Sequence, residues 1–101
     1  MNDIAKEFYK QKGYKLLDEG YICIDGMIDL IFKDEDTYIF VDVVIAPSKF
    51  KLDFIKASDM YLQEKEIFNV FVQFEKFGMI TDKKGQIIVH RKLIDFGVFT
   101  S

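Results

Sequence analysis

The sequence from residue 26 to residue 45, GMIDLIFKDEDTYIFVDVVI, decides the fold of this chain. It consists of two strongly apolar runs joined by an acidic turn, which predicts a β-hairpin. In each predicted strand the odd-numbered and the even-numbered positions are both largely apolar. This pattern is typical of strands that are covered on both faces. The hairpin is therefore expected to lie at the centre of a sheet.

An aspartate interrupts each of the two runs, at Asp29 and Asp42. If Glu35 and Asp36 form a two-residue loop, counting outward along the hairpin places Asp29 opposite Asp42. A three-residue loop would instead pair Asp29 with Val41. Directly opposed residues have Cβ atoms about 4.5–5.5 Å apart, so two carboxylates there repel unless a shared cation, a shared proton, a basic neighbour or water lies between them.

Mg²⁺, which binds carboxylate oxygens at roughly 2.0–2.1 Å, would fit between these aspartates. The simpler interpretation is two structural acids, one accepting backbone or hydroxyl hydrogen bonds and the other exposed at an edge. The two-residue loop also assigns the side chains to two faces. One face would carry Met27, Asp29, Ile31, Tyr38, Phe40, Asp42 and Val44. The other would carry Ile28, Leu30, Phe32, Ile39, Val41, Val43 and Ile45.

The rest of the chain is predicted to add two helices and further strands. A first helix should begin at Asn2 or Asp3 and end near Lys12. A second helix should follow Pro47, with Ser48 as its N-cap. Shorter apolar runs predict strands at Tyr14–Leu17, Tyr21–Ile24, Phe68–Phe74 and Ile87–His90, a turn at Asp18-Glu19-Gly20, and an apolar tail, Leu93–Phe99, packed on the body. This order of elements indicates an α/β fold with a mixed sheet flanked by helices.

The two strands of the hairpin resemble a known sequence signature. The segments GMIDLI (residues 26–31) and IFVDVV (residues 39–44) are similar to the GEIDLI and VFVEVK segments of the YraN-like family of small bacterial proteins. That family is grouped with the restriction-endonuclease-like, PD-(D/E)xK nucleases. The similarity extends from Ala5–Leu17 to Phe68–Gln73. The resemblance implies a small restriction-endonuclease-like core and a nuclease-type site.

The chain departs from this signature at several positions, and Asp42 is a shorter acid where the family has a glutamate. Met27 stands where the family has a glutamate, and Val44 stands where it has a lysine. In the superfamily, two acids hold the metal and the lysine helps to orient or activate the attacking water. The resemblance therefore implies that Asp29 and Asp42 are metal ligands and catalytic residues, while the role of the lysine is vacant at Val44.

A lysine from the following helix could take over this vacant role, as it does in some members of the superfamily. The candidate here is Lys51, with Lys49 and Lys56 on the same segment. If the site is active, the resemblance implies Mg²⁺ as its cofactor.

Composition limits the class of protein further. The chain has 101 residues, of which 50% are hydrophobic and 31% are charged, and this suits a single domain over residues 1–101. No apolar run reaches the eighteen or so residues of a membrane span, and the start MNDIAKEF has no signal-peptide pattern. The single cysteine, Cys23, fits a reducing compartment. We therefore expect a cytoplasmic protein without a membrane partner.

The net charge of −3 argues against strong binding to nucleic acid, because phosphate neutralisation by basic residues dominates such affinity. The leading hypothesis is thus an endonuclease-like protein with a degenerate site, which binds DNA or RNA weakly and cleaves it slowly or not at all. A second hypothesis is a Mg²⁺-dependent nuclease that uses Asp29, Asp42 and a lysine of the following helix. A third is a non-enzymatic interaction module, with self-association into a homodimer through a sheet edge or the apolar tail.

Overall fold

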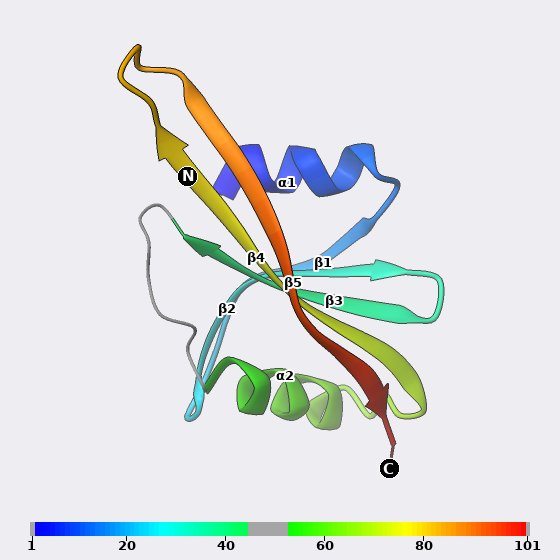
Figure 1. Cartoon of the computed structure of the whole chain (residues 1–101). Helices are drawn as coiled ribbons and strands as arrows, with labels where there is room; N and C mark the ends of the chain where they lie inside the picture. The colour runs from blue at the N-terminus through cyan, green and yellow to red at the C-terminus, as the bar shows by residue number, and fades with distance from the viewer. Residues whose placement is uncertain (1, 45–52, 101) are drawn as a thin grey trace.

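The computed structural model describes residues 2–44 and 53–100 of the chain. It contains two helices and five strands: α1 (Asn2–Gln11), β1 (Lys15–Cys23), β2 (Gly26–Asp34), β3 (Thr37–Val44), α2 (Asp53–Glu64), β4 (Val70–Thr81) and β5 (Ile87–Phe99). The strands form one sheet in the order β1-β2-β3-β4-β5, in which only β3 and β4 are parallel. Figure 1 shows α1 on one side of this sheet and α2 on the other. The prediction of an α/β fold with a mixed sheet between helices is confirmed.

The central hairpin has the predicted two-residue loop. Asp34 pairs with Thr37 and Lys33 with Tyr38, and the ladder continues to Leu30 opposite Val41. Glu35, the first loop residue, has a φ of 54°, which is the left-handed conformation that such tight hairpin loops use. The alternative three-residue loop is wrong.

The first strand does not contain the turn predicted at residues 18–20. β1 is continuous from Lys15 to Cys23, and Gly20 within it has a φ of 69°. This left-handed conformation is readily available only to glycine, and it bends the strand without ending it. The β1–β2 hairpin therefore curves toward α2 (Figure 1).

The same bend changes the predicted faces of β2. Ile28 and Ile31, which are three positions apart and would lie on opposite faces of a regular strand, pack in the same core cluster. Ile28 was predicted on the other face. Strand β2 therefore turns over between these two residues, at Asp29.

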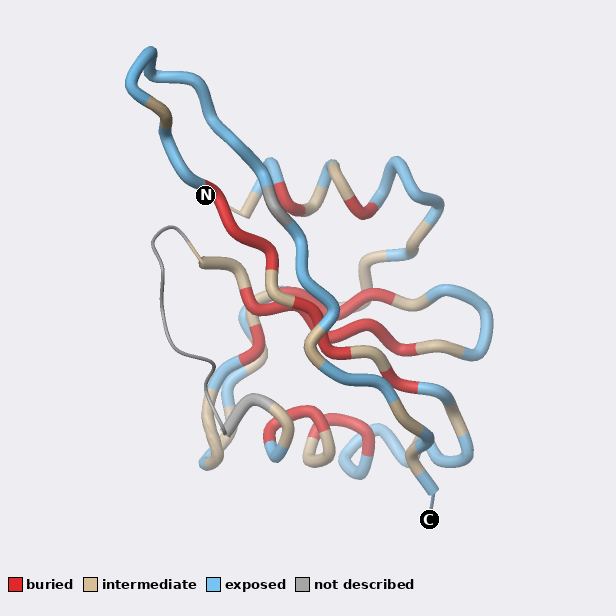
Figure 2. Tube along the Cα trace, viewed as in Figure 1, coloured by how far each residue is buried: buried red, intermediate tan, exposed pale blue. Residues whose placement is uncertain are grey.

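Two hydrophobic clusters cover the two sides of the sheet, and Figure 2 shows that the buried segments lie in the central strands and on the inner sides of the helices. The buried residues on the α2 side are Ile28, Ile31, Tyr38, Phe40, Ala57, Tyr61, Leu62, Val72 and Phe74. Those on the α1 side are Ala5, Tyr9, Leu30, Phe32, Ile39, Val41, Phe77 and Met79. Coverage of both sides explains why the central strands are apolar at nearly every position.

Two tyrosines tie α2 to the bent strand β1. The hydroxyl of Tyr61 donates to Asp18 Oδ2 at 2.7 Å, and the hydroxyl of Tyr21 donates to Glu64 Oε2 at 2.9 Å. The two rings also meet edge to face, with centroids 5.1 Å apart. Burial, together with the hydrogen bond to Glu64, raises the pKa of Tyr21 to about 12. Both hydroxyls thus act as neutral donors to carboxylates, and they fix the position of α2 over the sheet.

The C-terminal part of the chain is a long hairpin. β4 extends to Thr81, well past the predicted strand end at Phe74, and β5 is one strand where the sequence suggests a short strand and a packed tail. Ile94 and Phe99 pack against the α2-side core as predicted, but Phe96 is 70% exposed and Val98 is 59% exposed. Residues of one strand alternate between faces, and no described helix covers these two side chains.

Of the two described helices, α1 has 10 residues and α2 has 12, and neither is long and apolar enough to cross a membrane.

Candidate functional site

Asp29 and Asp42 lie just beyond the described end of the ladder between β2 and β3. Leu30 and Val41 are the last paired residues of the β2–β3 ladder, and the two aspartates follow them immediately. The backbone N–H of Val43 donates to Asp29 Oδ2 at 2.8 Å, so the Asp29 carboxylate reaches the residue beside Asp42. This hydrogen bond brings the Asp29 side chain to β3, while the direct opposition of the two acids stays a prediction.

Asp29 has a structural function at this point. The described ladder between β2 and β3 stops at Leu30, where β2 turns over, and the Asp29 side chain supplies one further bond to the β3 backbone. A carboxylate that accepts a backbone N–H forms a charge-assisted bond, which is stronger than a bond between neutral groups. One of the two predicted structural roles, an acid that accepts a backbone hydrogen bond, thus applies to Asp29.

Asp42 is not exposed at an edge, as the simpler interpretation proposed for the second acid. Only 2% of its surface is exposed, because β3 is the middle strand of the five. The alternation along β3 places Asp42 on the same side as Tyr38 and Phe40, which pack toward α2. A buried carboxylate is costly unless it is satisfied by a partner.

A lysine that the sequence did not single out lies beside Asp42. In the parallel register of β3 and β4, Asp42 is the partner of Lys76, and Lys76 in turn is the partner of Lys92 on β5. Adjacent strands are about 4.7–4.9 Å apart, and register partners project to the same side of a sheet. Asp42, Lys76 and Lys92 thus occupy successive register positions across β3, β4 and β5, and the Asp29 carboxylate of β2 binds the backbone of Val43 beside them. We call these four residues the acid–lysine row (Asp29, Asp42, Lys76 and Lys92).

The structure does not place any of the lysines predicted on the second helix beside Asp42. Lys51 and Lys49 lie outside the described residues. Lys56 is on α2 and is exposed. Among the described lysines, it is Lys76 that the sheet register brings next to Asp42. The signal in the sequence was weak: Val72, Phe74 and Lys76 alternate toward one side, but only the parallel pairing of β3 and β4 shows which residue they meet.

The acid–lysine row has few of the groups that a metal site requires. Among the described residues there is no cluster of three or more His, Cys, Asp or Glu side chains that could hold an ion. Mg²⁺ is often bound through only one or two carboxylates together with water, so two aspartates meet the minimum. One oxygen of Asp29 already accepts the Val43 N–H. The described residues therefore supply at most two carboxylates for an ion at this place, and its other ligands would be water.

A second buried acid, which no local sequence pattern indicates, lies on the opposite side of the sheet. Glu75 on β4 is fully buried. Its Oε1 accepts a hydrogen bond from the Tyr9 hydroxyl at 3.0 Å and one from Arg91 Nε at 2.5 Å, and Arg91 Nη2 lies 3.4 Å from Oε2. Burial and the nearby Glu75 carboxylate raise the pKa of the Tyr9 hydroxyl strongly, so Tyr9 remains a neutral donor. This triad joins α1, β4 and β5, and its groups satisfy one another.

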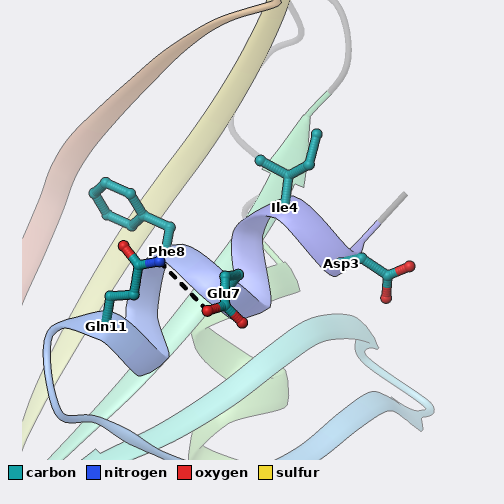
Figure 3. Close-up of a pocket in the computed structure, with 5 residues that line it drawn as sticks. All are labelled: Asp3, Ile4, Glu7, Phe8 and Gln11. Carbon is teal, nitrogen blue, oxygen red and sulfur yellow. Dashed lines mark hydrogen bonds between the residues drawn. The ribbon is translucent and has the colours of Figure 1, made fainter.

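A shallow hollow lies along α1, away from the two aspartates. Figure 3 shows its lining residues, which are Asp3, Ile4, Glu7, Phe8 and Gln11. Gln11 Nε2 donates to Glu7 Oε1 at 3.3 Å across its surface. Glu7 is exposed, and α1 covers the side of the sheet opposite to Asp42. The hollow therefore adds no third acid to the acid–lysine row.

Comparison with known proteins identifies the family. The model of a family described as "Uncharacterised protein family UPF0102" matches residues 1–81, which run from α1 through β4. The chain belongs to UPF0102. The prediction of YraN-like membership is confirmed by this match, and the wider grouping with PD-(D/E)xK nucleases stays a prediction.

Individual UPF0102 proteins are similar to this chain over most or part of its length. A UPF0102 protein of Clostridium kluyveri is 30% identical over 90 residues, which cover 77% of this chain and 74% of the relative. One from Syntrophus aciditrophicus is 29% identical over 95 residues, covering 81% and 74%. A shorter match of 40 residues, at 40% identity, links the chain to a UPF0102 protein of Vibrio parahaemolyticus. Strand β5 lies beyond the residues that the family model matches.

Proposed function

We propose that this UPF0102 chain is an endonuclease-like protein with a degenerate site, which binds the phosphate backbone of nucleic acid weakly and cleaves it slowly or not at all. The observation that carries the proposal is the acid–lysine row, in which the register sets Lys76 beside Asp42, and the Asp29 carboxylate accepts the N–H of Val43, the residue after Asp42. Paired acids with an adjacent lysine are the donor types that nuclease sites use around a phosphate.

Each member of the acid–lysine row has a distinct part in this proposal. Lys76 offers a compact positive charge that binds a phosphate oxygen, and it offsets the charge of Asp42. Asp42 and the second oxygen of Asp29 would hold Mg²⁺. When bound, such an ion polarises the phosphate as a Lewis acid. The positive charge that the sequence assigned to Lys51 is therefore proposed to come from Lys76.

Three features of the chain support slow cleavage or none. The hydrogen bond to Val43 N occupies one oxygen of Asp29. Asp42 is almost completely buried, so an ion reaches it only against the surrounding core. Val44, two residues further along the same face, has no group that can orient water. Each feature weakens ion binding or proton transfer and leaves the sheet intact.

Weak affinity follows from the charge of the chain. Tight binding to nucleic acid rests on many phosphate contacts, each of which releases counterions. The net charge is −3, and Arg91, one of the cations of β5, already pairs with Glu75. Few phosphates are therefore contacted at once, and binding should be strongest at low salt.

A salt titration of oligonucleotide binding tests this proposal. Fluorescence anisotropy with labelled single-stranded and branched DNA should show binding that fades with salt. Lys76→Ala should weaken it several-fold and lower the salt slope by about 1, as expected for the loss of one phosphate contact. The matched control is Lys10→Ala, which removes an exposed lysine of α1 on the other side of the sheet and should leave binding unchanged.

Two outcomes would argue against the proposal. One is the absence of any binding by the parent protein at low salt. The other is an equal loss of affinity in the Lys76 and Lys10 variants, which would indicate attraction by the overall charge without a defined site.

A non-enzymatic interaction module is the second candidate function, and the exposed apolar side chains of β5 favour it. Phe96, Val98 and Leu93 are 70%, 59% and 46% exposed, and they lie on one strand at the edge of the sheet.

A further inference from the structure

Strand β5 is an unusually long sheet edge. It has 13 residues, whereas strands usually have about 5–6, and β4 pairs with only one of its two edges. A long apolar edge offers a row of unpaired backbone donors and acceptors to another strand. Figure 2 shows that β5 is exposed along most of its length.

A bulge at Ile94 reverses which residues of β5, odd-numbered or even-numbered, face the α1 side. The register with β4 shifts there, from Glu75 opposite Leu93 to Phe74 opposite Asp95. Before the bulge, odd-numbered residues such as Val89 share the α1 side with Met79 and Phe77; after it, the even-numbered Phe96 and Val98 do so. In an antiparallel pair of β5 strands, odd residues of one half must therefore meet even residues of the other half to keep the faces matched.

We propose that two copies of this chain form a dimer by antiparallel pairing of β5 with β5, with Lys92 of each copy opposite Asp95 of the other. The two-fold axis then passes between Leu93 and Ile94. On the α1 side, this register sets Val89 opposite Val98 and Arg91 opposite Phe96. An isologous pairing of this kind uses the same strand on both copies and closes after two.

Charge complementarity selects this register. Lys92 is the register partner of Lys76 within the same sheet, and like charges at directly opposed positions are unfavourable. Asp95 of the second copy would offset this repulsion, and the symmetry supplies the pair twice. A register that sets Arg91 opposite Lys92 brings like charges together, and it also opposes residues of different faces, because Arg91 lies on the α1 side and Lys92 on the α2 side. Lys92 and Asp95 in the centre of β5 thus favour one register for the pairing of the two β5 strands.

A charge-swap experiment tests the dimer. The molecular mass in solution is measured by light scattering and by sedimentation over a range of concentrations for the full chain and its variants. The parent should be dimeric. Lys92→Glu and Asp95→Lys should each raise the dissociation constant by about tenfold or more, because each turns two attractive pairs into two repulsive ones. The combined Lys92→Glu/Asp95→Lys variant should restore dimerisation to near the parent level.

The control variant is Ile24→Glu, which changes a 96% exposed apolar residue in the β1–β2 turn, away from β5. It should leave the dimer unchanged. Circular dichroism verifies that each variant is folded. The proposal is overturned by a parent that remains monomeric at every concentration, by single swaps that do not weaken the dimer, by a combined swap that does not restore it, or by dissociation in the Ile24 variant.

Discussion

Replacing Glu75 with alanine is expected to lower the free energy of unfolding by about 3 kcal/mol, the lower end of the range for breaking a buried ion pair. Glu75 is fully buried, and its loss leaves Arg91 and the Tyr9 hydroxyl without their carboxylate partner. The lower end applies because the Arg91 side chain remains 30% exposed and water can partly solvate it. Urea denaturation followed by circular dichroism measures this loss.

Two further variants separate the contributions within this triad. Tyr9→Phe removes a single hydrogen bond and should cost roughly 1–2 kcal/mol. Glu7→Ala removes an exposed glutamate of α1 and should change stability by less than about 0.5 kcal/mol. A loss for Glu75→Ala that is no larger than the Glu7→Ala effect would show that the triad does not hold the sheet to α1.

Restoring the YraN-like signature in β3 should produce the largest change in DNA cleavage. In the double variant Asp42→Glu/Val44→Lys, residues 39–44 become IFVEVK, which restores the longer acid and the lysine of the YraN-like pattern. Val44 is the register partner of Gly78, which has no side chain, so a lysine at this position has space beside it. We expect Mg²⁺-dependent cleavage of DNA at least about a hundredfold above the parent, a typical contribution of a positioned proton-transfer group.

A triple variant serves as the control for this expected gain in cleavage. Adding Asp29→Ala to the double variant should return cleavage to the parent level, because Asp29 is the second proposed ion ligand. Cleavage that survives this third change would come from a contaminating nuclease. A folded double variant with no gain would count against a nuclease-like origin of the site.

Local sequence signals were enough to predict the central part of this fold. The two-residue loop at Glu35-Asp36 fixed the register of the hairpin as far as Leu30 opposite Val41, the residues that adjoin Asp29 and Asp42. The boundaries of α1 followed from its cap and its amphipathic spacing. These features depend on residues that are close in the sequence, where turn geometry and periodicity act directly.

The features that escaped prediction depend on pairing between distant segments. Asp18-Glu19-Gly20 has the composition of a turn, but pairing with β2 keeps it within a bent strand. Lys76 meets Asp42 only through the parallel register of β3 and β4, and Glu75 is satisfied only where α1 and β5 converge. Nothing local distinguishes these residues from ordinary strand charges. The exposure of Phe96 likewise depends on what the two helices leave uncovered.

Paramagnetic line broadening by Mn²⁺ in an amide NMR spectrum tests the central claim most directly, because it locates a weakly bound ion without requiring activity. The acid–lysine row predicts that at millimolar Mn²⁺ the amide signals of Asp29, Asp42, Val43 and Lys76 broaden first, and that Asp42→Asn abolishes this pattern. Broadening centred on the α1 acids Asp3 and Glu7, or no localised broadening at all, would contradict a shared cation site between the two central strands.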